Sequence, residues 1–291
     1  MLINPYQSPR LREKKRKQRK IQIILGSIIF IILFVGFVYL SNSDSLRIQR
    51  IIVNDLNFSD RNEIENIIKE QIEGRYFGLF LKSNIFIFPR AKIERKIKTT
   101  YSSISYINID AKGLHTISLE IEEFQPSAKW CDVPVTPALN PNHVNDENIS
   151  AIPQTLNSYS GQCYLMTSDG MIFAKDNNLE GDFIKTFGFI TSDPLRQKYS
   201  DSKTFRDLID FVKLLRRLNI EANEVWTTDG EVYAVVTKEK VKIYIDGEDD
   251  IVSVFNNLQT VIERDAINKA QFANIDYIDL RFGNRVFYKL K

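Results

Sequence analysis

The longest apolar run of the chain is "IQIILGSIIFIILFVGFVYL", residues 21–40, which contains no charged residue. A helix of this length spans about 30 Å, the thickness of the hydrocarbon core of a bilayer. A core helix of a water-soluble protein would carry a polar stripe, and this segment has none. The pattern therefore predicts one transmembrane helix over residues 21–40.

The charges beside this run predict its orientation. Residues 10–20, "RLREKKRKQRK", contain eight basic residues and one acidic residue, Glu13, and so have a net charge of +7. Because the net charge of the whole chain is +2, the remaining residues sum to −5. By the positive-inside rule, residues 1–20 form a basic cytoplasmic tail and residues 41–291 lie outside the membrane. Nucleic-acid binding explains the position of the basic run less well. A cleaved signal peptide would have a shorter apolar region and a small-x-small site, so we favour an uncleaved anchor in the cell (inner) membrane.

The pattern after the anchor predicts a small α+β domain over residues 46–130. A β-rich run at 46–53 is followed by "SDRNEIENIIKEQIEG", which has isoleucines at helical spacing. A second helix is expected after Pro89. Two alternating runs separated by Lys112-Gly113 then predict a β-hairpin. The order of elements is β-α-α-β-β.

A second α+β domain is predicted over residues 161–291, after a Pro- and Asn-rich segment at 131–160 that is typical of an exposed loop. Its pattern is a mainly antiparallel sheet with two covering helices. The expected order is a hairpin turning at Asp169-Gly170, an amphipathic helix in "TFRDLIDFVKLLRRLNI", three strands in 223–246 with a turn at Asp229-Gly230, a helix at 250–263 and a closing hairpin at 277–289.

Cys131 and Cys163 flank the Pro-rich segment. In a compartment that permits disulfides, a bridge would close a loop of about 33 residues and stabilise the fold by about 3–4 kcal/mol. Two unpaired thiols are the alternative reading. Zinc is disfavoured because His143 is the one histidine between them and the spacing fits no common site.

Signals for catalysis are weak. The chain has two histidines, His115 and His143, and no nucleophile elbow, zinc-protease, P-loop or dinucleotide motif. The acidic run 246–250 is better explained as a solvated turn that caps the next helix than as a calcium site. We therefore expect no enzyme activity, no cofactor, no metal and no small-molecule substrate.

The last residues, "YIDLRFGNRVFYK", predict a regular hairpin where chain ends usually fray. Alternation places Ile278, Leu280 and Phe282 on the core face and directs Asp279 and Arg281 outward, where they could serve only as surface charges. The final run, "RVFYKL", carries Val286, Tyr288 and Leu290 on one face and Phe287 on the other. Such a strand at a sheet edge invites pairing with another chain.

These motifs, in this order, resemble the FtsQ/DivIB family of bacterial cell-division proteins. The resemblance covers the basic tail, the single span, a POTRA domain that begins with "LRIQRIIVND" and ends with "EEFQPSAKW", and the hairpins "CYLMTSDGMIFA" and "YIDLRFGNRVFYK" of the family's β domain. It implies a non-enzymatic bitopic scaffold at the division septum.

In the family, the POTRA domain is linked to recruitment and the β domain receives FtsB- and FtsL-like partners by strand addition. The resemblance therefore implies contact with other division proteins, including the septal peptidoglycan synthesis machinery. The residues that match the family's docking strand, and that we expect to bind a partner, are Arg281, Phe282, Arg285, Val286, Phe287 and Tyr288. The 132–160 insertion and the two cysteines depart from the family pattern.

Two other classes remain open at this level. One is another POTRA-bearing envelope protein that serves secretion or outer-membrane assembly, although such proteins usually carry a membrane β-barrel. The other is an anchored envelope sensor or enzyme, which a deep polar pocket with converging titratable groups would support. The sequence does not distinguish a periplasmic from an extracellular location for residues 41–291.

Overall fold

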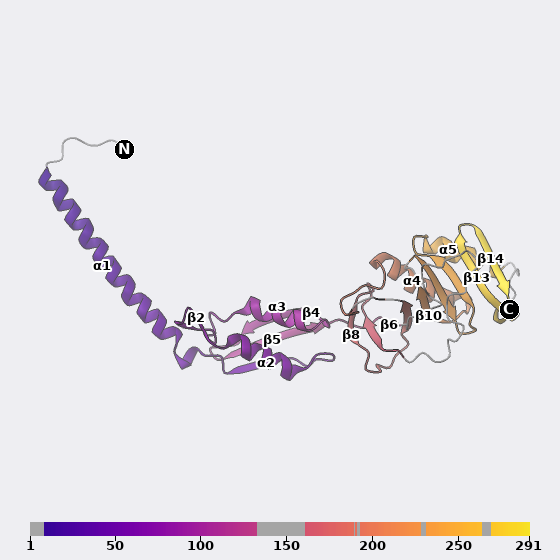
Figure 1. Cartoon of the computed structure of the whole chain (residues 1–291), viewed down its shortest axis with the longest axis horizontal. Helices are drawn as coiled ribbons and strands as arrows, with labels where there is room; N and C mark the ends of the chain where they lie inside the picture. Colours follow the sequence, from indigo (N-terminus) through magenta and orange to yellow (C-terminus); the bar gives the residue numbers. More distant parts are fainter. Residues whose placement is uncertain (1–8, 133–160, 189, 191–192, 228–230, 264–268) are drawn as a thin grey trace. The chain divides into compact units, whose positions relative to one another are not determined.

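A computed structural model of the chain describes residues 9–132, 161–188, 190, 193–227, 231–263 and 269–291. The chain has a mixed α+β architecture and divides into two compact units, Met1–Glu122 and Glu123–Lys291 (Figure 1). The expected loop at 133–160 and the expected turn at Asp229-Gly230 lie outside the described residues.

The N-terminal helix α1 spans Pro9–Ser41, so it includes the basic stretch as well as the apolar run. Among the described residues, its part Arg16–Ser41 is the one helix long and apolar enough to cross a membrane, and none of its most apolar window is buried. These properties fit a single membrane anchor.

The rest of the first unit is a three-stranded sheet with two helices and a small separate hairpin. Strand β5 lies between β1, with which it runs parallel, and β4. The helix α2 begins after Asp60, whose carboxylate accepts hydrogen bonds from the backbone N–H groups of Asn62 and Glu63. The elements are β1 (Arg50–Val53), α2 (Arg61–Ile72), β2 (Arg75–Tyr76), β3 (Phe80–Leu81), α3 (Arg90–Thr100), β4 (Ile104–Ala111) and β5 (Thr116–Glu123), after a 3₁₀ turn at Asp44–Leu46.

Isoleucine side chains build the core of this unit. The helices pack their apolar stripes on the sheet, and each fully buried isoleucine contributes about 1.5–3 kcal/mol. Those with no exposed surface are Ile64, Ile68, Ile93, Ile97, Ile109 and Ile117. The pairing of β2 with β3 was not expected from the sequence.

The second unit contains a nine-stranded sheet in the order β14-β13-β12-β11-β10-β9-β6-β7-β8. Most neighbours are antiparallel, while β6–β9, β9–β10 and β12–β13 are parallel. Its elements are β6 (Ala128–Asp132), β7 (Cys163–Met166), β8 (Ile172–Lys175), β9 (Ile184–Gly188), α4 (Ser202–Leu215), β10 (Ala222–Thr227), β11 (Val232–Thr237), β12 (Lys242–Asp246), α5 (Ile251–Glu263), β13 (Ile275–Phe282) and β14 (Arg285–Leu290), with 3₁₀ turns at Arg216–Leu218 and Lys269–Asn274.

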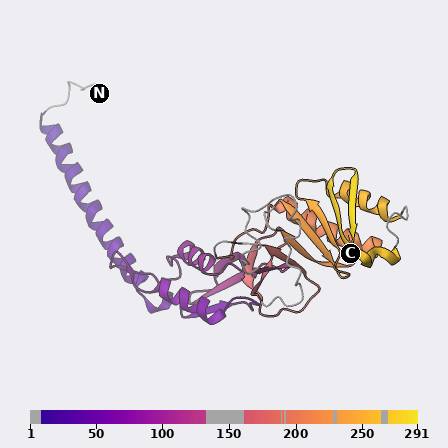
Figure 2. The same cartoon turned by 45° about the vertical axis from the view of Figure 1, so that its right-hand side comes forward.

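Helices α4 and α5 pack together on one face of this sheet, as the amphipathic pattern predicts (Figure 2). Phe205 and Leu258 are fully buried members of this layer. The acidic turn before α5 acts as a cap, because the Asp250 carboxylate accepts a hydrogen bond from the backbone N–H of Ser253 at 3.1 Å.

The boundary between the units differs from the expected one. We placed residues 128–130 at the end of the first domain, whereas Ala128–Asp132 form a strand of the second sheet, between β9 and β7. The strand Ile184–Gly188 had no counterpart in the prediction. Both strands form parallel pairs with segments far along the chain, which local patterns do not reveal.

Candidate functional site: the C-terminal strand edge

Strand β14 is the last strand of the chain and also the last strand of the nine-stranded sheet (Figures 1 and 2). It pairs antiparallel with β13 on one side. On its other side, the described residues provide no strand. Alternate backbone N–H and C=O groups of an edge strand point away from the sheet, so β14 presents a row of groups that can pair with another strand.

The register of the hairpin assigns the β14 side chains to the two faces of the sheet. Tyr288 lies opposite Ile278, which belongs to the core beneath the helices, so Tyr288 lies on the helix side. Phe287 lies opposite Asp279 on the other face. Val286 packs partly against the helix-side core. The alternation predicted from the sequence therefore agrees with the register at these positions.

Large apolar side chains remain exposed on both faces of the edge. The exposed fractions are 54% for Phe282, 49% for Phe287, 45% for Tyr288 and 57% for Leu290. The rings of Phe282 and Phe287 pack edge to face with centroids 5.3 Å apart. Exposed apolar side chains gathered on one hairpin, here β13 and β14, are typical of an interaction surface.

The expected position of Phe282 on the core face is wrong. The pairing of β13 with β14 shifts register between Asp279 and Phe282, just before the Gly283 turn, where φ is +60°. This irregularity ends the strict alternation that buries Ile278 and Leu280. Phe282 consequently lies among the exposed residues, where its ring contacts Phe287.

Asp279 and Arg281 are also not simple surface charges. Asp279 is buried, and its carboxylate accepts hydrogen bonds from Arg281 Nε at 2.8 Å and Nη2 at 2.6 Å. These bonds raise the pKa of Arg281. The guanidinium lies 5.7 Å from the ring centroid of Tyr244 and 5.6 Å from that of Phe282. The ion pair thus fixes a cation within cation–π distance of two aromatic rings, next to the edge strand.

Tyr244 lies beneath Arg281 as a buried residue, a position that no local sequence pattern predicts. It lies on β12, which pairs parallel with β13, and its ring packs edge to face against Tyr277. Burial raises the pKa of Tyr244 to about 12, so it stays neutral at physiological pH. Of the predicted partner-binding residues, Arg281, Phe282 and Phe287 come together here, Val286 and Tyr288 lie on the helix side, and Arg285 lies at the turn opposite Phe282.

The opposite edge of the same sheet is covered. Strand β8 exchanges hydrogen bonds with a following segment: Ile172 N–H donates to the Gln197 carbonyl at 2.9 Å, and Arg196 N–H donates to the Ile172 carbonyl at 2.7 Å. Ile172 and Phe173 have no exposed surface. At Ile172 the backbone groups on this outer side are therefore paired, and the first residues of β8 present none of the apolar surface that β14 exposes.

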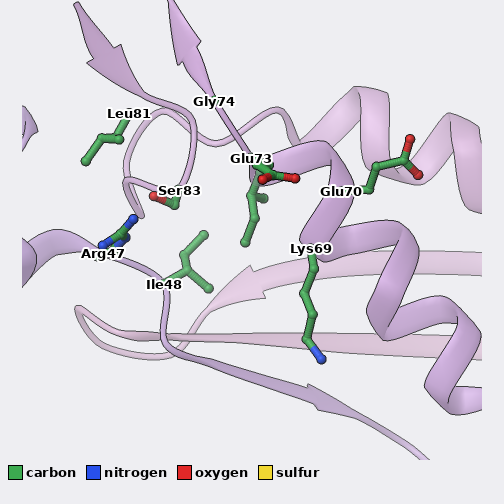
Figure 3. Close-up of a pocket in the computed structure, with 9 residues that line it drawn as sticks. Arg47, Ile48, Lys69, Glu70, Glu73, Gly74, Leu81 and Ser83 are labelled. Carbon is green, nitrogen blue, oxygen red and sulfur yellow. The ribbon is translucent and has the colours of Figure 1, made fainter.

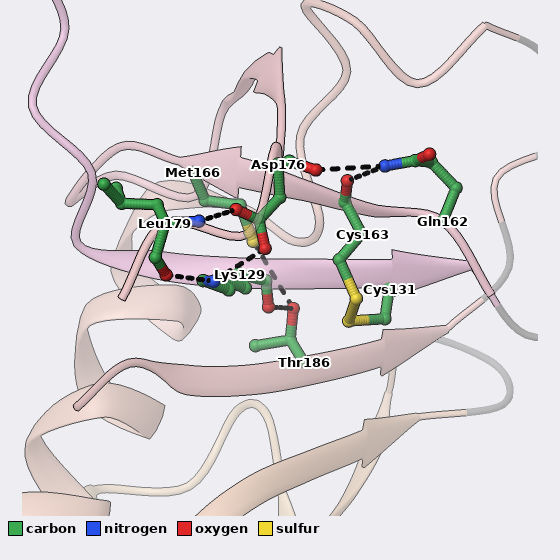
Figure 4. Close-up of a disulfide and its surroundings, with 8 residues drawn as sticks. All are labelled: Lys129, Cys131, Gln162, Cys163, Met166, Asp176, Leu179 and Thr186. Atoms are coloured by element: carbon green, nitrogen blue, oxygen red, sulfur yellow. Dashed lines mark hydrogen bonds and ion pairs between the residues drawn. A yellow bond between two sulfur atoms is a disulfide. The ribbon is translucent and has the colours of Figure 1, made fainter. Parts of the chain in front are cut away.

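The two cysteines form a disulfide between β6 and β7, where they lie directly opposite each other with Cα atoms 4.1 Å apart (Figure 4). Beside it, the ammonium of Lys129 lies 2.6 Å from the Asp176 carboxylate and donates to the Leu179 carbonyl at 2.7 Å. Both charged side chains are largely buried. This end of the sheet is thus closed by a covalent bond and an ion pair.

A cavity of about 540 Å³ in the first unit is lined by Arg47, Lys69, Glu70 and Glu73 among other residues. Figure 3 shows these side chains pointing in different directions instead of toward a common point. No group of three or more potential metal-ligating residues occurs in the part of the chain that the structure describes. We therefore place no reaction in this cavity.

Comparison of the sequence with protein-family models and with curated proteins finds no match. Function is consequently inferred from the geometry of the strand edge, together with the motifs that resemble the FtsQ/DivIB family.

Proposed function

We propose that this protein is a membrane-anchored scaffold without enzyme activity that binds a partner polypeptide by strand addition to β14. The observation that carries this proposal is an edge strand whose outer side is unpaired within the described residues and whose two faces both carry exposed apolar side chains. Native proteins usually blunt such edges with charge, bulges or a covering segment, because an open edge promotes aggregation. A dedicated partner removes this liability.

The geometry supports recognition of an extended segment. The outward backbone groups of β14 supply hydrogen bonds that are independent of the partner's sequence, and the side chains above and below supply specificity. Phe282 and Phe287 would contact residues on one face of an added strand, while Tyr288 and Leu290 would contact the other. Arg281, held by Asp279, would stay in place without losing rotamer freedom on binding.

The resemblance supplies the biological setting of the proposal. Residues 46–130 would act as a POTRA-type domain in recruitment, and the second unit would receive FtsB- or FtsL-like proteins at the division septum. Residues 1–20 would lie in the cytoplasm and both units outside the cell membrane. The three-stranded sheet with two helices in the first unit is compatible with this assignment.

The proposal is tested by depleting the protein from its host while a fluorescent fusion of it is followed. We expect the fusion at the septum and filamentous growth on depletion. The variant Phe287→Asp should restore division poorly, whereas Val252→Asp, which changes an exposed apolar residue in the first turn of α5 in the same unit, should restore it fully. Normal division on depletion, or full rescue by Phe287→Asp, would contradict the proposal.

A further inference from the structure

The hairpin that β2 and β3 form in the first unit exposes apolar side chains to an unusual degree. We call residues 74–82, "GRYFGLFLK", the aromatic hairpin. Phe77 at its tip is 95% exposed, and Leu79 is also exposed. Transfer of such a side chain from water to an apolar environment is favourable. The tip therefore offers apolar surface that the described residues do not cover.

Contacts with α1 place this hairpin beside the membrane anchor. The ring centroid of Phe80 lies 6.2 Å from that of Phe34 and 5.8 Å from that of Phe37. Asn42 donates a hydrogen bond to the Leu79 carbonyl at 2.8 Å and another to the Val38 carbonyl at 2.7 Å. The aromatic hairpin is thus joined to the last turns of α1 by both packing and hydrogen bonds.

A second contact satisfies the end of the helix. Asn84, which follows the hairpin and is buried, donates to the Ser41 carbonyl at 2.9 Å. Ser41 is the last residue of α1, and the terminal carbonyls of a helix have no partner within the helix. Because Asn84 satisfies one of them, the segment after the hairpin is fixed to the C-terminus of the anchor.

These contacts determine how deep the hairpin lies. Phe34 and Phe37 belong to the apolar run that ends at Leu40, and at 1.5 Å per residue they lie about 9 Å and about 5 Å inward of it. Phe80, which contacts both rings, therefore lies below the level of Leu40, within the outer margin of the hydrocarbon core. A tilt of α1 would reduce this depth without bringing Phe80 out of the interfacial region.

The charges around the hairpin fit a lipid surface. Arg75 is the first residue of β2 and Lys82 directly follows β3, and the Lys82 ammonium lies 6.0 Å from the Tyr76 ring centroid. The sequence contains no acidic residue between Glu73 and Glu94. Cations that extend toward headgroups beside Tyr and Phe rings are typical of membrane interfaces.

We propose that the aromatic hairpin inserts into the outer interface of the bilayer and forms a second membrane contact next to α1. The occupant of its apolar surface is lipid, with Phe77 among acyl chains and Arg75 and Lys82 at phosphate headgroups. This inference depends on the membrane anchor of the proposed function but not on the partner at β14. Its consequence is that the first unit is held at the membrane surface by two contacts.

The test is tryptophan fluorescence of the full chain, reconstituted into vesicles of phosphatidylcholine and phosphatidylglycerol. Phe77→Trp places the probe at the hairpin tip. The matched control is Tyr106→Trp, an exposed aromatic position on β4. Tyr106 follows Ser105, whose hydroxyl donates a hydrogen bond to the Glu122 carbonyl near the end of β5. The start of β5 pairs with β1, the first strand after the anchor. The control position therefore lies at the end of this sheet that is far from the anchor. The emission of the native Trp130 and Trp226 is measured on the unmodified chain and subtracted from the spectrum of each variant.

We expect the added emission of Phe77→Trp to be blue-shifted and to lose most of its intensity when the phosphatidylcholine carries bromine on its acyl chains near the carbonyl end. Tyr106→Trp should show neither effect. If Phe77→Trp in floated vesicles emits like Tyr106→Trp and resists quenching, the hairpin does not enter lipid and the inference is wrong. If the chain fails to float with vesicles, the anchor itself is wrong, which refutes the proposed membrane location as well.

Discussion

The two outer strands of the nine-stranded sheet differ in whether their outer sides are paired and buried. Strand β8 is buried, and a following segment of the chain supplies hydrogen bonds to its outer side. Strand β14 is largely exposed, and the described residues leave its outer side unpaired. The same fold thus closes one edge and leaves the other open. The proposed strand addition would account for this difference, because native sheets usually protect an exposed edge strand unless it pairs with a partner.

Each edge nevertheless contains a buried aspartate with a cationic partner, Asp176 with Lys129 near β8 and Asp279 with Arg281 near β14. At the covered end, the pair lies beside the disulfide and holds the loop after β8. At the open end, the pair lies near the buried ring of Tyr244 and the exposed ring of Phe282. These matched features allow a test of whether one edge serves stability and the other serves binding.

The largest effect is expected from removing one member of a buried ion pair. Lys129→Met leaves the Asp176 carboxylate without its cation and should lower the free energy of unfolding by about 3–5 kcal/mol. Arg281→Met should cost less, because the Arg281 side chain is 20% exposed against 11% for Lys129, and because Lys129 also donates a hydrogen bond to the Leu179 carbonyl that its loss would leave unpaired. Urea unfolding followed by the fluorescence of Trp130 and Trp226, both in the second unit, measures the two values. Equal costs would contradict the assignment of the stabilising role to the covered end.

Loss of the disulfide should have the next largest effect. Replacing both Cys131 and Cys163 with Ser releases a loop whose ends are 32 residues apart, which should destabilise the second unit by about 3–4 kcal/mol. The same urea titration with and without reductant measures this, and the Ser variant, which has no thiol, serves as the control insensitive to reductant. A mass increase on alkylation without prior reduction would show free thiols and refute the bridge.

A charge on the open edge should weaken binding without unfolding the protein. Phe287→Asp removes an exposed ring and places a carboxylate in the proposed interface, so the partner complex should lose about 2 kcal/mol, roughly 30-fold in affinity. Tyr288→Asp should act in the same direction, and Val286→Pro, which removes a backbone N–H, should also weaken the complex. Pull-down of a co-expressed FtsB- or FtsL-like partner measures capture, with Tyr106→Asp as control. Unchanged capture by all three variants would rule out β14 as the docking strand.

The smallest effect concerns acid pH at the covered edge. A hydrogen bond from the Thr167 hydroxyl, together with Lys198, lowers the pKa of Asp169 in the turn before β8. A carboxylate with a lowered folded pKa adds stability above its unfolded value of about 4, and this stability is lost as pH falls through the folded pKa. The contribution is below about 1 kcal/mol, because the side chain is 42% exposed and solvent screens it. Asp169→Asn should therefore reduce the difference in stability between pH 6 and pH 3, and an unchanged difference would contradict this assignment.

Local sequence patterns predicted the helices well. One hydrophobic pattern within each segment predicted α1, α2, α4 and α5: a continuous apolar run for α1 and apolar residues at helical spacing for the others. The structure has a helix at each of these places. The turns at Gly113 and Gly170 follow from the need for positive φ, which is +81° and +82° there. Such features depend on neighbours within a few residues, so the sequence alone suffices.

Features that depend on distant pairing were missed. The position of Tyr244 beside Arg281 requires the parallel pairing of β12 with β13, and the covered state of β8 requires residues 196–198 to return to it. Phe282 was misplaced because its register shift is a property of the pair of strands. The aromatic hairpin was also missed. Phe77-Gly78 separates two short apolar runs, which is a hairpin signal, but the signal is weak because each strand has only two residues.

Hydrogen–deuterium exchange of the full chain, alone and with its co-expressed partner, tests the central claim most directly. Residues 285–290 are compared with residues 172–175 of the covered edge. The account predicts that the outward amides of β14 exchange quickly in the chain alone and become protected in the complex, while β8 is protected in both. Amides of β14 that are as protected as those of β8 in the chain alone, or that stay unprotected in the complex, would contradict strand addition at this edge.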